Sequence, residues 1–340
     1  MLNLTKTEPL GLDIGSFAVK AVQLNKDESG YSIAAAGIVE IAVNEQTDND
    51  LSTITAIHEC FEIIGSKTKM VVCGLSGPEV AIRDFQFPSL AASEVEGAVL
   101  FEASQVCPFN PTDSTVDYHL ITNDENKTSG VLVAATNTLI TDKVDLTKEA
   151  ALKCVLMDVE GLALLNCYSG LNNDSENSTI AILNVGSSCT TLAIMGSNGR
   201  PFIRDMTFAG KDIINHIAAE KSMPTQEVKK ILSDESMKAH SELKDSLGKA
   251  CTKLMVDVSK TLRYYATQEQ TKPVRKILVC GGFALIDGFI ELLNSRLGVE
   301  AVLWNPFDKI RFDGERQFED ICAKKGPALA VAAGLAMRSV

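Results

Sequence analysis

The sequence has 340 residues, of which 45% are hydrophobic and 6% aromatic, and its net charge at pH 7 is −12. This length is enough for two lobes with separate apolar cores. The acidic balance argues against nonspecific binding of nucleic acid or anionic membranes, and no stretch approaches the ~20 consecutive apolar residues of a membrane-spanning helix.

The cysteines and histidines do not indicate a metal site or a thiol-catalytic site. The nine cysteines include no Cys-x-x-Cys pair, and the four histidines are scattered. Reduced, mostly buried thiols are therefore expected. Residues 1–10 also lack the apolar core of a signal peptide.

The first expected elements are two strands, 10–14 and 18–25, joined by a tight corner at Gly15 and Ser16. Backbone amides in such a turn bind phosphate, and a preceding carboxylate, here Asp13, can hold hydrated Mg²⁺ beside it. Lys20 lies on an apolar face of the second strand, where an ammonium group needs an anionic partner. Because Asp-x-Gly turns occur in many hairpins, this motif alone is weak.

The first lobe is expected to continue with a strand, 31–42, a helix, 48–64, and a strand, 70–75. A different unit follows, which we interpret as a small α+β insert in this lobe. We expect Ser93 to cap its first helix, with Glu96 at the third position. Its expected elements are a strand, 81–87, ended by Pro88, a helix, 93–106, strands 115–122 and 130–136, and a helix, 139–153.

The segment 179–194 repeats the design of the first hairpin. Asn184 lies 171 positions after Asp13, and Gly186 lies 171 positions after Gly15. Two apolar strands again flank a Gly-Ser corner. The chain is therefore expected to consist of two halves of similar design, and the repeat makes phosphate binding the favoured interpretation.

Three helices are expected after the second hairpin. Gly210 and Lys211 begin the first, 213–219, either as additional phosphate-binding amides or as a plain cap. Pro224 opens the second helix. The third, 244–268, has one apolar stripe that we interpret as core, formed by Leu247, Cys251, Leu254, Val258, Leu262 and Tyr265.

A buried type of strand, 277–280, then ends in the glycine pair Gly281 and Gly282, before Phe283 and a helical pattern at 286–297. Glycines at such a position let the backbone lie flat against a planar ring or a phosphate.

These three motifs together resemble the actin-like ATPase superfamily, in which two phosphate hairpins and an adenosine-binding glycine pair face one another across a cleft. The resemblance implies an α/β fold of duplicated actin-like (ribonuclease H-like) lobes, with ATP and Mg²⁺ as cofactors and Asp13 beside the metal. The nucleotide-binding residues that follow are Asp13, Gly15, Ser16, Phe17, Lys20, Asn184, Gly186, Ser187, Ser188, Thr190, Gly210, Lys211, Glu227, Lys230, Gly281, Gly282 and Phe283.

Some of these assignments have alternatives. Glu227 and Lys230 resemble the Glu-x-x-Lys pair that contacts ribose and adenine, but they also fit a surface ion pair. In this superfamily a group near the end of the first lobe orients the attacking water, and here Asp158 and Glu160 are the candidates, although either could cap a helix at 161–167. Asn184 replaces the usual Asp of the second motif, which implies weaker metal binding and at most a weak ATPase.

Within the superfamily, the chain is similar to the PilM family of type IV pilus assembly proteins, on the FtsA-like branch. The similarity runs from about residue 10 to 338 and includes Phe87-Pro88-Ser89-Leu90, Cys107-Pro108-Phe109 and the small-residue-rich segment 326–338. The resemblance implies a first lobe at 1–82 and 154–177, an inserted subdomain at 83–153, a second lobe at 178–210 and 274–340, and a helical subdomain at 211–273.

The same resemblance implies a cytoplasmic ATP-binding scaffold, peripherally associated with the inner membrane through its partners. Its expected partners are the N-terminal cytoplasmic segment of a PilN-like membrane protein, other pilus platform proteins and possible further copies of the chain. The insert would supply the peptide groove. Alternatives are an FtsA-like polymerising ATPase, which usually carries a membrane-targeting helix after its core, and a small-molecule kinase, which needs an Asp base where this chain has the insert.

Overall fold

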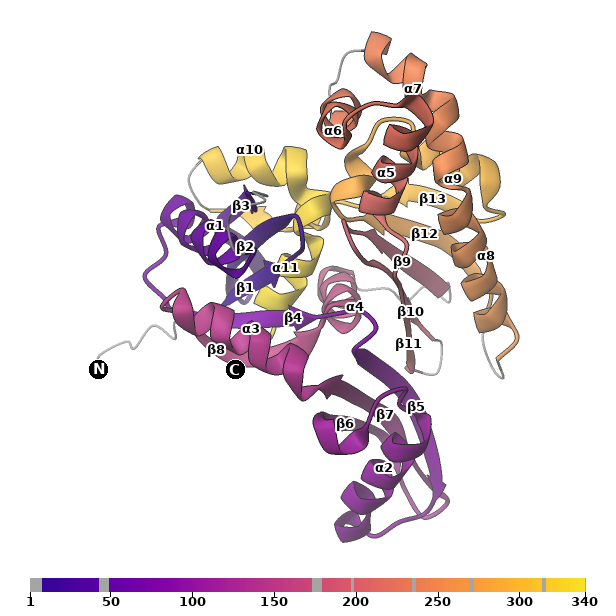
Figure 1. Ribbon diagram of the computed structural model, residues 1–340. Coiled ribbons are helices and arrows are strands. Elements are labelled where there is room, and N and C mark those ends of the chain that lie inside the picture. The colour runs from indigo at the N-terminus through magenta and orange to yellow at the C-terminus, as the bar shows by residue number, and fades with distance from the viewer. Residues whose placement is uncertain are drawn as a thin grey trace.

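Three β-sheets organise the protein, seen in a computed structural model that describes residues 8–42, 49–172, 179–196, 199–233, 237–268, 272–313 and 316–339, without the side chains of residues 237–242. Two sheets form the centres of two lobes that lie side by side, and a third, smaller sheet projects from the first lobe (Figure 1). None of the described helices is both long enough and apolar enough to cross a membrane.

The sheet of the first lobe has the strand order β14-β3-β2-β1-β4-β8. The strands β1, β2 and β3 form the expected antiparallel meander. In parallel, β4 pairs with β1, β8 pairs with β4, and β14 pairs with β3. The strands are β1 (Leu10–Ile14), β2 (Ala18–Asp27), β3 (Gly30–Glu40), β4 (Met70–Leu75), β8 (Lys153–Val159) and β14 (Arg311–Phe312).

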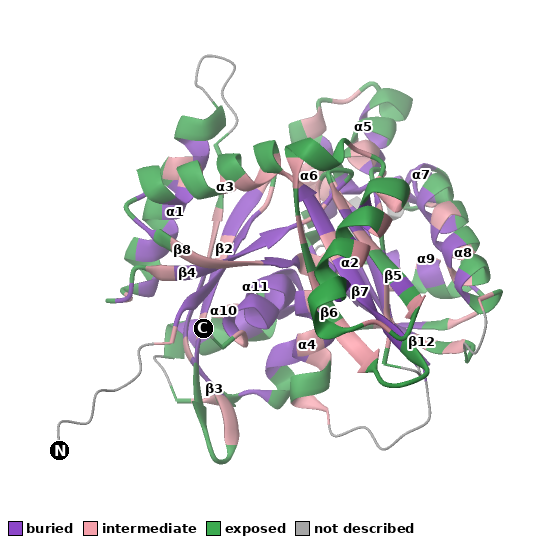
Figure 2. Ribbon diagram, turned by 90° about the horizontal axis from the view of Figure 1, so that it is seen from below, coloured by how far each residue is buried: buried purple, intermediate pink, exposed green. Residues whose placement is uncertain are grey.

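Helices cover both faces of this sheet. On one face, α1 (Asn49–Ile64) and α3 (Asn137–Glu149) pack over an apolar cluster that includes Leu12 and Ile57. On the other face lie α4 (Glu160–Leu171) and α11 (Ala330–Ala336). The helix α10 (Arg316–Lys325) packs beside β3. Figure 2 shows the buried residues concentrated in the strands and in α11.

The sheet of the second lobe has the order β11-β10-β9-β12-β13, and α4 and α11 lie between it and the first sheet. On the face of this sheet that points away from the first lobe, α5, α7, α8 and α9 cover a large apolar core. The helix α6 packs on α5 and α7. The elements are β9 (Thr179–Val185), β10 (Thr190–Met195), β11 (Pro201–Met206), α5 (Gly210–Lys221), α6 (Thr225–Ser233), α7 (Met237–Ala250), α8 (Thr252–Ala266), β12 (Val274–Cys280), α9 (Phe289–Arg296) and β13 (Glu300–Leu303).

The inserted unit has its own small core. Strands β5 (Val80–Pro88), β7 (Lys127–Thr136) and β6 (Ser114–Asn123) form an antiparallel sheet in that order, and α2 (Ala92–Val106) packs on it. Val95 and Val99, one helical turn apart on α2, are buried in this core. Phe101, on the opposite face of α2, is 69% exposed. Short 3₁₀ turns lie at Pro111–Asp113, Gly282–Leu285, Pro306–Lys309 and Gly326–Leu329.

The structure corrects where the first helix expected in the insert begins and where the second one ends. Ser93 is not the cap of α2. The cap is Ala91, whose backbone amide donates to the Glu94 carboxylate at 3.1 Å, so the reciprocal residue is Glu94 and not Glu96. The helix expected at 139–153 ends at Glu149, and Ala151 then has a left-handed φ of 56°.

The helix expected at 244–268 is two helices, α7 and α8, which meet at Cys251. The hydroxyl of Thr252 donates to the carbonyl oxygen of Gly248 at 3.3 Å, a bond of the kind that bends helices. The apolar stripe continues across this junction with helical spacing, which is why periodicity did not reveal it. The stripe is core, as predicted: Leu247, Cys251, Leu254, Val258 and Tyr265 are buried, and Leu262 packs against them.

The backbone of α11 is in direct contact with its neighbours. A Cβ atom at Gly11 of β1 would lie 2.0 Å from the carbonyl oxygen of Ala332. A Cβ atom at Gly334 of α11 would lie 2.2 Å from the carbonyl oxygen of Ala163 in α4. Both distances are far below van der Waals contact, so these positions accept only glycine in the present arrangement.

Candidate functional site

A cavity of about 620 Å³ lies between the two lobes. The corner between β1 and β2 and the corner between β9 and β10 line it, and the glycine pair after β12 lines it as well. The fold therefore brings together the three motifs that the sequence assigned to one site. The predicted residues that line the cavity are Asp13, Gly15, Ser16, Phe17, Lys20, Asn184, Gly186, Ser187, Ser188, Gly210, Gly281, Gly282 and Phe283.

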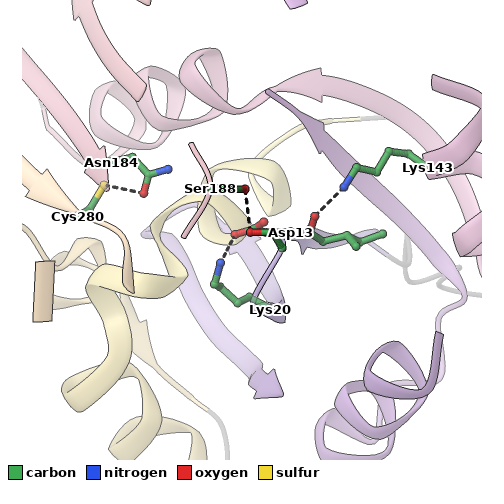
Figure 3. A network of polar contacts seen from close by, with 8 residues as sticks. Asp13, Lys20, Lys143, Asn184, Ser188 and Cys280 are labelled. Atoms are coloured by element: carbon green, nitrogen blue, oxygen red, sulfur yellow. Dashed lines mark hydrogen bonds and ion pairs between the residues drawn. The ribbon is translucent and has the colours of Figure 1, made fainter. Parts of the chain in front are cut away.

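Asp13 and Lys20 form an ion pair across the first hairpin. They are cross-strand partners, and Lys20 Nζ lies 2.7 Å from Asp13 Oδ2 (Figure 3). Burial alone would lower the pKa of Lys20, but the charge of Asp13 and the hydrogen bond to it together raise that pKa above its ordinary value. The anionic partner that the sequence predicted for Lys20 is therefore Asp13.

The second hairpin has neutral residues at the positions of this ion pair. Asn184 faces Thr191 across β9 and β10, and the two lie 171 positions after Asp13 and Lys20. The thiol of Cys280 approaches Asn184 Oδ1 at 3.9 Å (Figure 3). Both positions are neutral, so the second hairpin has no ion pair like that of the first, and the Thr191 hydroxyl instead donates to Asp205 Oδ1 at 2.6 Å.

Contacts across the cavity join the two lobes. Ser188 Oγ donates to Ser16 Oγ at 2.8 Å, so the tips of the two hairpins touch (Figure 3). Lys229 of α6 lies over the ring of Phe17, with its ammonium 4.8 Å from the ring centre. The first hairpin is thus held both by the second hairpin and by a helix of the second lobe.

The start of α5 holds the second hairpin in place. The amide of Gly210 donates to the carbonyl oxygen of Gly186 at 3.0 Å, and the amide of Lys211 donates to that of Ser187 at 2.8 Å. A Cβ atom at Gly210 would lie 2.8 Å from the ring of Phe283. Gly210 therefore allows α5, the hairpin and the Phe283 ring to meet closely.

Gly281 has a conformation that only glycine adopts easily. Its φ is +93°, and a Cβ atom there would lie 2.4 Å from the carbonyl oxygen of Val185 and 2.6 Å from Asn184 Oδ1. Its amide donates to the carbonyl oxygen of Pro327 at 2.8 Å. Gly281 is thus fixed against the second hairpin on one side and the segment before α11 on the other, and both glycines line the cavity.

Glu160 is the acidic candidate that lies at the cavity. It is the first residue of α4 and lines the wall together with Asp13. Burial, and next the negative charge of Asp13, raise the pKa of Glu160 to about 7, against the opposing effects of Lys143 and of a hydrogen bond with Ser76. A carboxyl with a pKa near neutrality can exchange a proton with water at physiological pH.

Asp158, the other candidate, lies away from the cavity. It is not among the lining residues, and its Oδ2 atom lies 3.2 Å from Nε of Arg338. Its own neighbour, Val159, is the N-cap of α4, and this helix has no side-chain cap hydrogen bond. Between the two candidates, only Glu160 is in a position to contact a ligand in the cavity.

Replacing Glu160 by glutamine is expected to remove part of the pH dependence of the free energy of unfolding. The folded carboxyl has a pKa of about 7 and the ordinary value is 4.5, so the folded chain holds the extra proton between these values. The stability that the Glu160 carboxyl gives to the fold is therefore fully present below about pH 4.5, and it is lost as the pH rises through 7. Urea unfolding should show Glu160→Gln close to wild type at low pH and more stable at pH 8; an equal difference at both would contradict this account.

Four other predicted residues do not line the cavity. Thr190 is buried and its hydroxyl donates to the carbonyl oxygen of Phe208. Glu227 and Lys230 are exposed on α6, and Lys211 contributes its amide to the hairpin.

The cavity also has lining residues that the sequence analysis missed. Lys229 of α6 lies there, between the predicted residues Glu227 and Lys230, so a different face of this helix borders the cavity. The buried residues Val228 and Leu232 could have fixed that face, because they orient the helix. Lys143 of α3 and Ser76, which follows β4, also line the cavity. Nothing in the local sequence distinguishes them from surface residues.

The residues around the cavity fit a metal ion that binds together with a ligand. Among the residues that the structure describes, no group of three or more His, Cys, Asp or Glu side chains is placed to hold a metal ion. Asp13 is 5% exposed and lines the cavity, which suits Mg²⁺ that takes most of its ligands from water and phosphate oxygens. Because Lys20 already neutralises Asp13, we expect such an ion to bind together with a nucleotide and not alone.

Comparison with known proteins gives one family and several similar structures. A family described as type IV pilus assembly protein PilM matches residues 11–340. A solved structure of a PilM-PilN type IV pilus biogenesis complex contains a chain with 23% identity and a TM-score of 0.81, and the match covers 97% of this chain and 98% of that one.

Two further structures share the fold at lower similarity. The ethanolamine utilization protein EutJ from Carboxydothermus hydrogenoformans is 14% identical with a TM-score of 0.56, over 99% of this chain and 91% of that one. A glycerol dehydratase reactivase is 10% identical with a TM-score of 0.56, over 96% and 99%. The expected fold, duplicated α/β lobes around a shared cleft, is confirmed.

Proposed function

The chain belongs to the type IV pilus assembly protein PilM family, and from this premise we propose that it is an actin-like, ATP-binding scaffold of the pilus assembly platform. The observation that carries the proposal is the meeting of two repeated hairpins and a glycine pair at one interlobe cavity, in a chain that matches the family over residues 11–340. The alternatives of a filament-forming ATPase and a small-molecule kinase are not favoured.

In this proposal the chain's own residues bind the nucleotide phosphates between the lobes. The corners at Gly15 and Gly186 would face the phosphates, and Asp13 would hold the hydration shell of Mg²⁺. When bound, Mg²⁺ neutralises the charge of the phosphate groups. Because Asn184 supplies no second carboxylate, we expect turnover to be at most weak, with Glu160 as the residue placed to orient water.

We further propose that the partner is the N-terminal cytoplasmic segment of a PilN-like membrane protein, bound at the insert. The similar structure in a PilM-PilN complex supports this choice of partner. The edge position of β6 in the three-stranded sheet offers backbone groups to an extended peptide, and Phe101 is 69% exposed on the neighbouring α2. Binding of this kind would place the chain on the cytoplasmic side of the inner membrane, through its partner.

The proposed boundaries of the insert follow from two hydrogen bonds. The amide of Thr136 donates to the carbonyl oxygen of Glu79 at 3.1 Å, and its hydroxyl donates to the Glu79 carboxylate at 2.8 Å. Beyond this pair, α3 packs on the first lobe, and Ala150 and Leu152 lie in that lobe's core. A clean excision should therefore leave α3 in place and should not extend to residue 152.

Excising residues 81–134 is expected to abolish binding of the partner peptide while leaving ATP binding intact. Val80 and Ala135 are cross-strand partners, so an Asn-Gly turn can join them as a two-residue hairpin loop. Fluorescence anisotropy with a peptide of the PilN-like protein from the same genome measures the first effect, and calorimetry with MgATP measures the second. Retention of peptide binding by a variant that still binds ATP would exclude the insert as the partner site.

A further inference from the structure

Both chain connections of the insert run along the wall of the interlobe cavity. The first connection, between β4 and β5, contributes Ser76, Gly77 and Pro78 to that wall. The second connection leads from β7 straight into α3, which contributes Leu139, Lys143 and Leu146. The insert therefore has no route to the first lobe that bypasses the proposed nucleotide site.

These connections are also tied to both lobes. The amide of Gly77 donates to Oδ2 of Asp205 in β11 at 2.7 Å, and Oδ1 of Asp205 accepts the hydroxyl of Thr191 at 2.6 Å. The two connections are joined to each other by the bonds between Thr136 and Glu79. A movement of either lobe at the cavity would therefore move the two connections that join the insert to the first lobe.

Lys143 is the charged residue that α3 presents to this cavity. Its ammonium donates to the carbonyl oxygen of Ile14 at 2.6 Å, as Figure 3 shows. Ile14 is the last residue of β1, directly before the turn that would face the phosphates. The positive charge of Lys143 also counteracts the rise of the pKa of Glu160, which lines the same cavity.

We propose that Lys143 binds the terminal phosphate of a nucleoside triphosphate, and that it distinguishes the triphosphate from the diphosphate. The inference rests on the proposed nucleotide binding. The carbonyl oxygen of Ile14 is a neutral acceptor, whereas a phosphate oxygen carries charge and makes a stronger hydrogen bond with an ammonium group. Lys20 cannot easily serve in its place, because it is paired with Asp13.

This assignment gives the insert a way to respond to the nucleotide. Lys143 lies on the helix that directly continues β7, so a terminal phosphate bound to it pulls on the second connection of the insert. If ATP changes the affinity for a peptide bound at the insert, the peptide must change the affinity for ATP by the same factor. Lys143 would be the residue through which this coupling acts.

The test uses the variant Lys143→Met, which keeps the length of the side chain and removes its charge. Calorimetry with MgATP and MgADP should show an affinity for MgATP that is lower by about tenfold or more, the loss expected for one charge-assisted hydrogen bond, and an unchanged affinity for MgADP. Lys148→Met is the matched control, because Lys148 lies on the same helix, is exposed and does not line the cavity. Lys143→Arg should retain the preference for ATP.

The outcomes separate this inference from the function on which it rests. Wild-type protein that binds neither nucleotide would overturn the proposed function. Wild-type protein that binds both, together with a Lys143→Met variant whose ratio of ATP to ADP affinity is unchanged, would overturn the role of Lys143 alone. If Lys143→Met does not fold, loss of the ATP preference in the more conservative Lys143→Gln supports the assignment, and its retention overturns it.

Discussion

Replacing Asp13 by asparagine is expected to lower the affinity for MgATP by about 100-fold, the upper range for losing a side chain that orients a metal's ligands. Asp13 is the carboxylate that lines the cavity at the first phosphate hairpin, and asparagine keeps its shape without its charge. Titration calorimetry with and without Mg²⁺ measures the effect, which should be small for nucleotide alone and large with the metal present.

The substitution also removes the countercharge of Lys20, which is largely buried. A buried charge without a partner can cost about 3–5 kcal/mol of stability. The double variant Asp13→Asn/Lys20→Met removes both charges and separates this effect from the loss of metal binding. Asp27→Asn is the matched control: Asp27 lies at the other end of β2 and pairs with Arg311 at 2.6 Å. Unchanged MgATP affinity in a folded Asp13→Asn variant would exclude Asp13 from the metal site.

Replacing Gly11 by alanine is expected to destabilise the fold by about 4 kcal/mol or more, a loss seen only for severe core disruption. The added Cβ would lie 2.0 Å from the carbonyl oxygen of Ala332 and 2.5 Å from the amide nitrogen of Ala336, so α11 would have to leave β1. Urea unfolding followed by circular dichroism measures the change.

Gly97→Ala is the control with the opposite sign. Gly97 lies inside α2, and an added Cβ would meet no atom within 4 Å. The same chemical change should therefore stabilise the insert by about 0.5–1 kcal/mol, the usual gain of alanine over glycine in a helix. If Gly11→Ala unfolded at the same urea concentration as wild type, the close packing of α11 on β1 would be wrong.

The parts of the site built from local patterns could be predicted from the sequence. The Asp13 corner and its repeat at Asn184 each need only a turn between two apolar strands, and Gly281 marks the end of a third strand. The apolar face of β2 and the stripe along α7 and α8 were sufficient to predict which residues of these elements are buried, because an element packs with its apolar face against the core.

Residues that reach the cavity from helices could not be predicted in the same way. Lys143 and Lys148 lie on the same helix with similar neighbours, and only the packing of α3 on the first lobe turns Lys143 inward. For the same reason the sequence did not indicate that Lys229 lines the cavity, since its helix is short and the orientation of that helix depends on α5 and α7. Which residues of a helix line a cavity is decided by tertiary contacts between distant segments.

The packing of α11 has a consequence for how the chain is made. The strand β1 and the helix α11, which covers one of its faces, are separated by residues 15–329, so β1 leaves the ribosome long before α11. The ribosome adds about 5–20 residues per second, so β1 is synthesised on the order of tens of seconds before α11 can pack on it. During that time its apolar face is open to other nascent chains. Holding chaperones should therefore bind this protein during translation, and release it when α11 emerges.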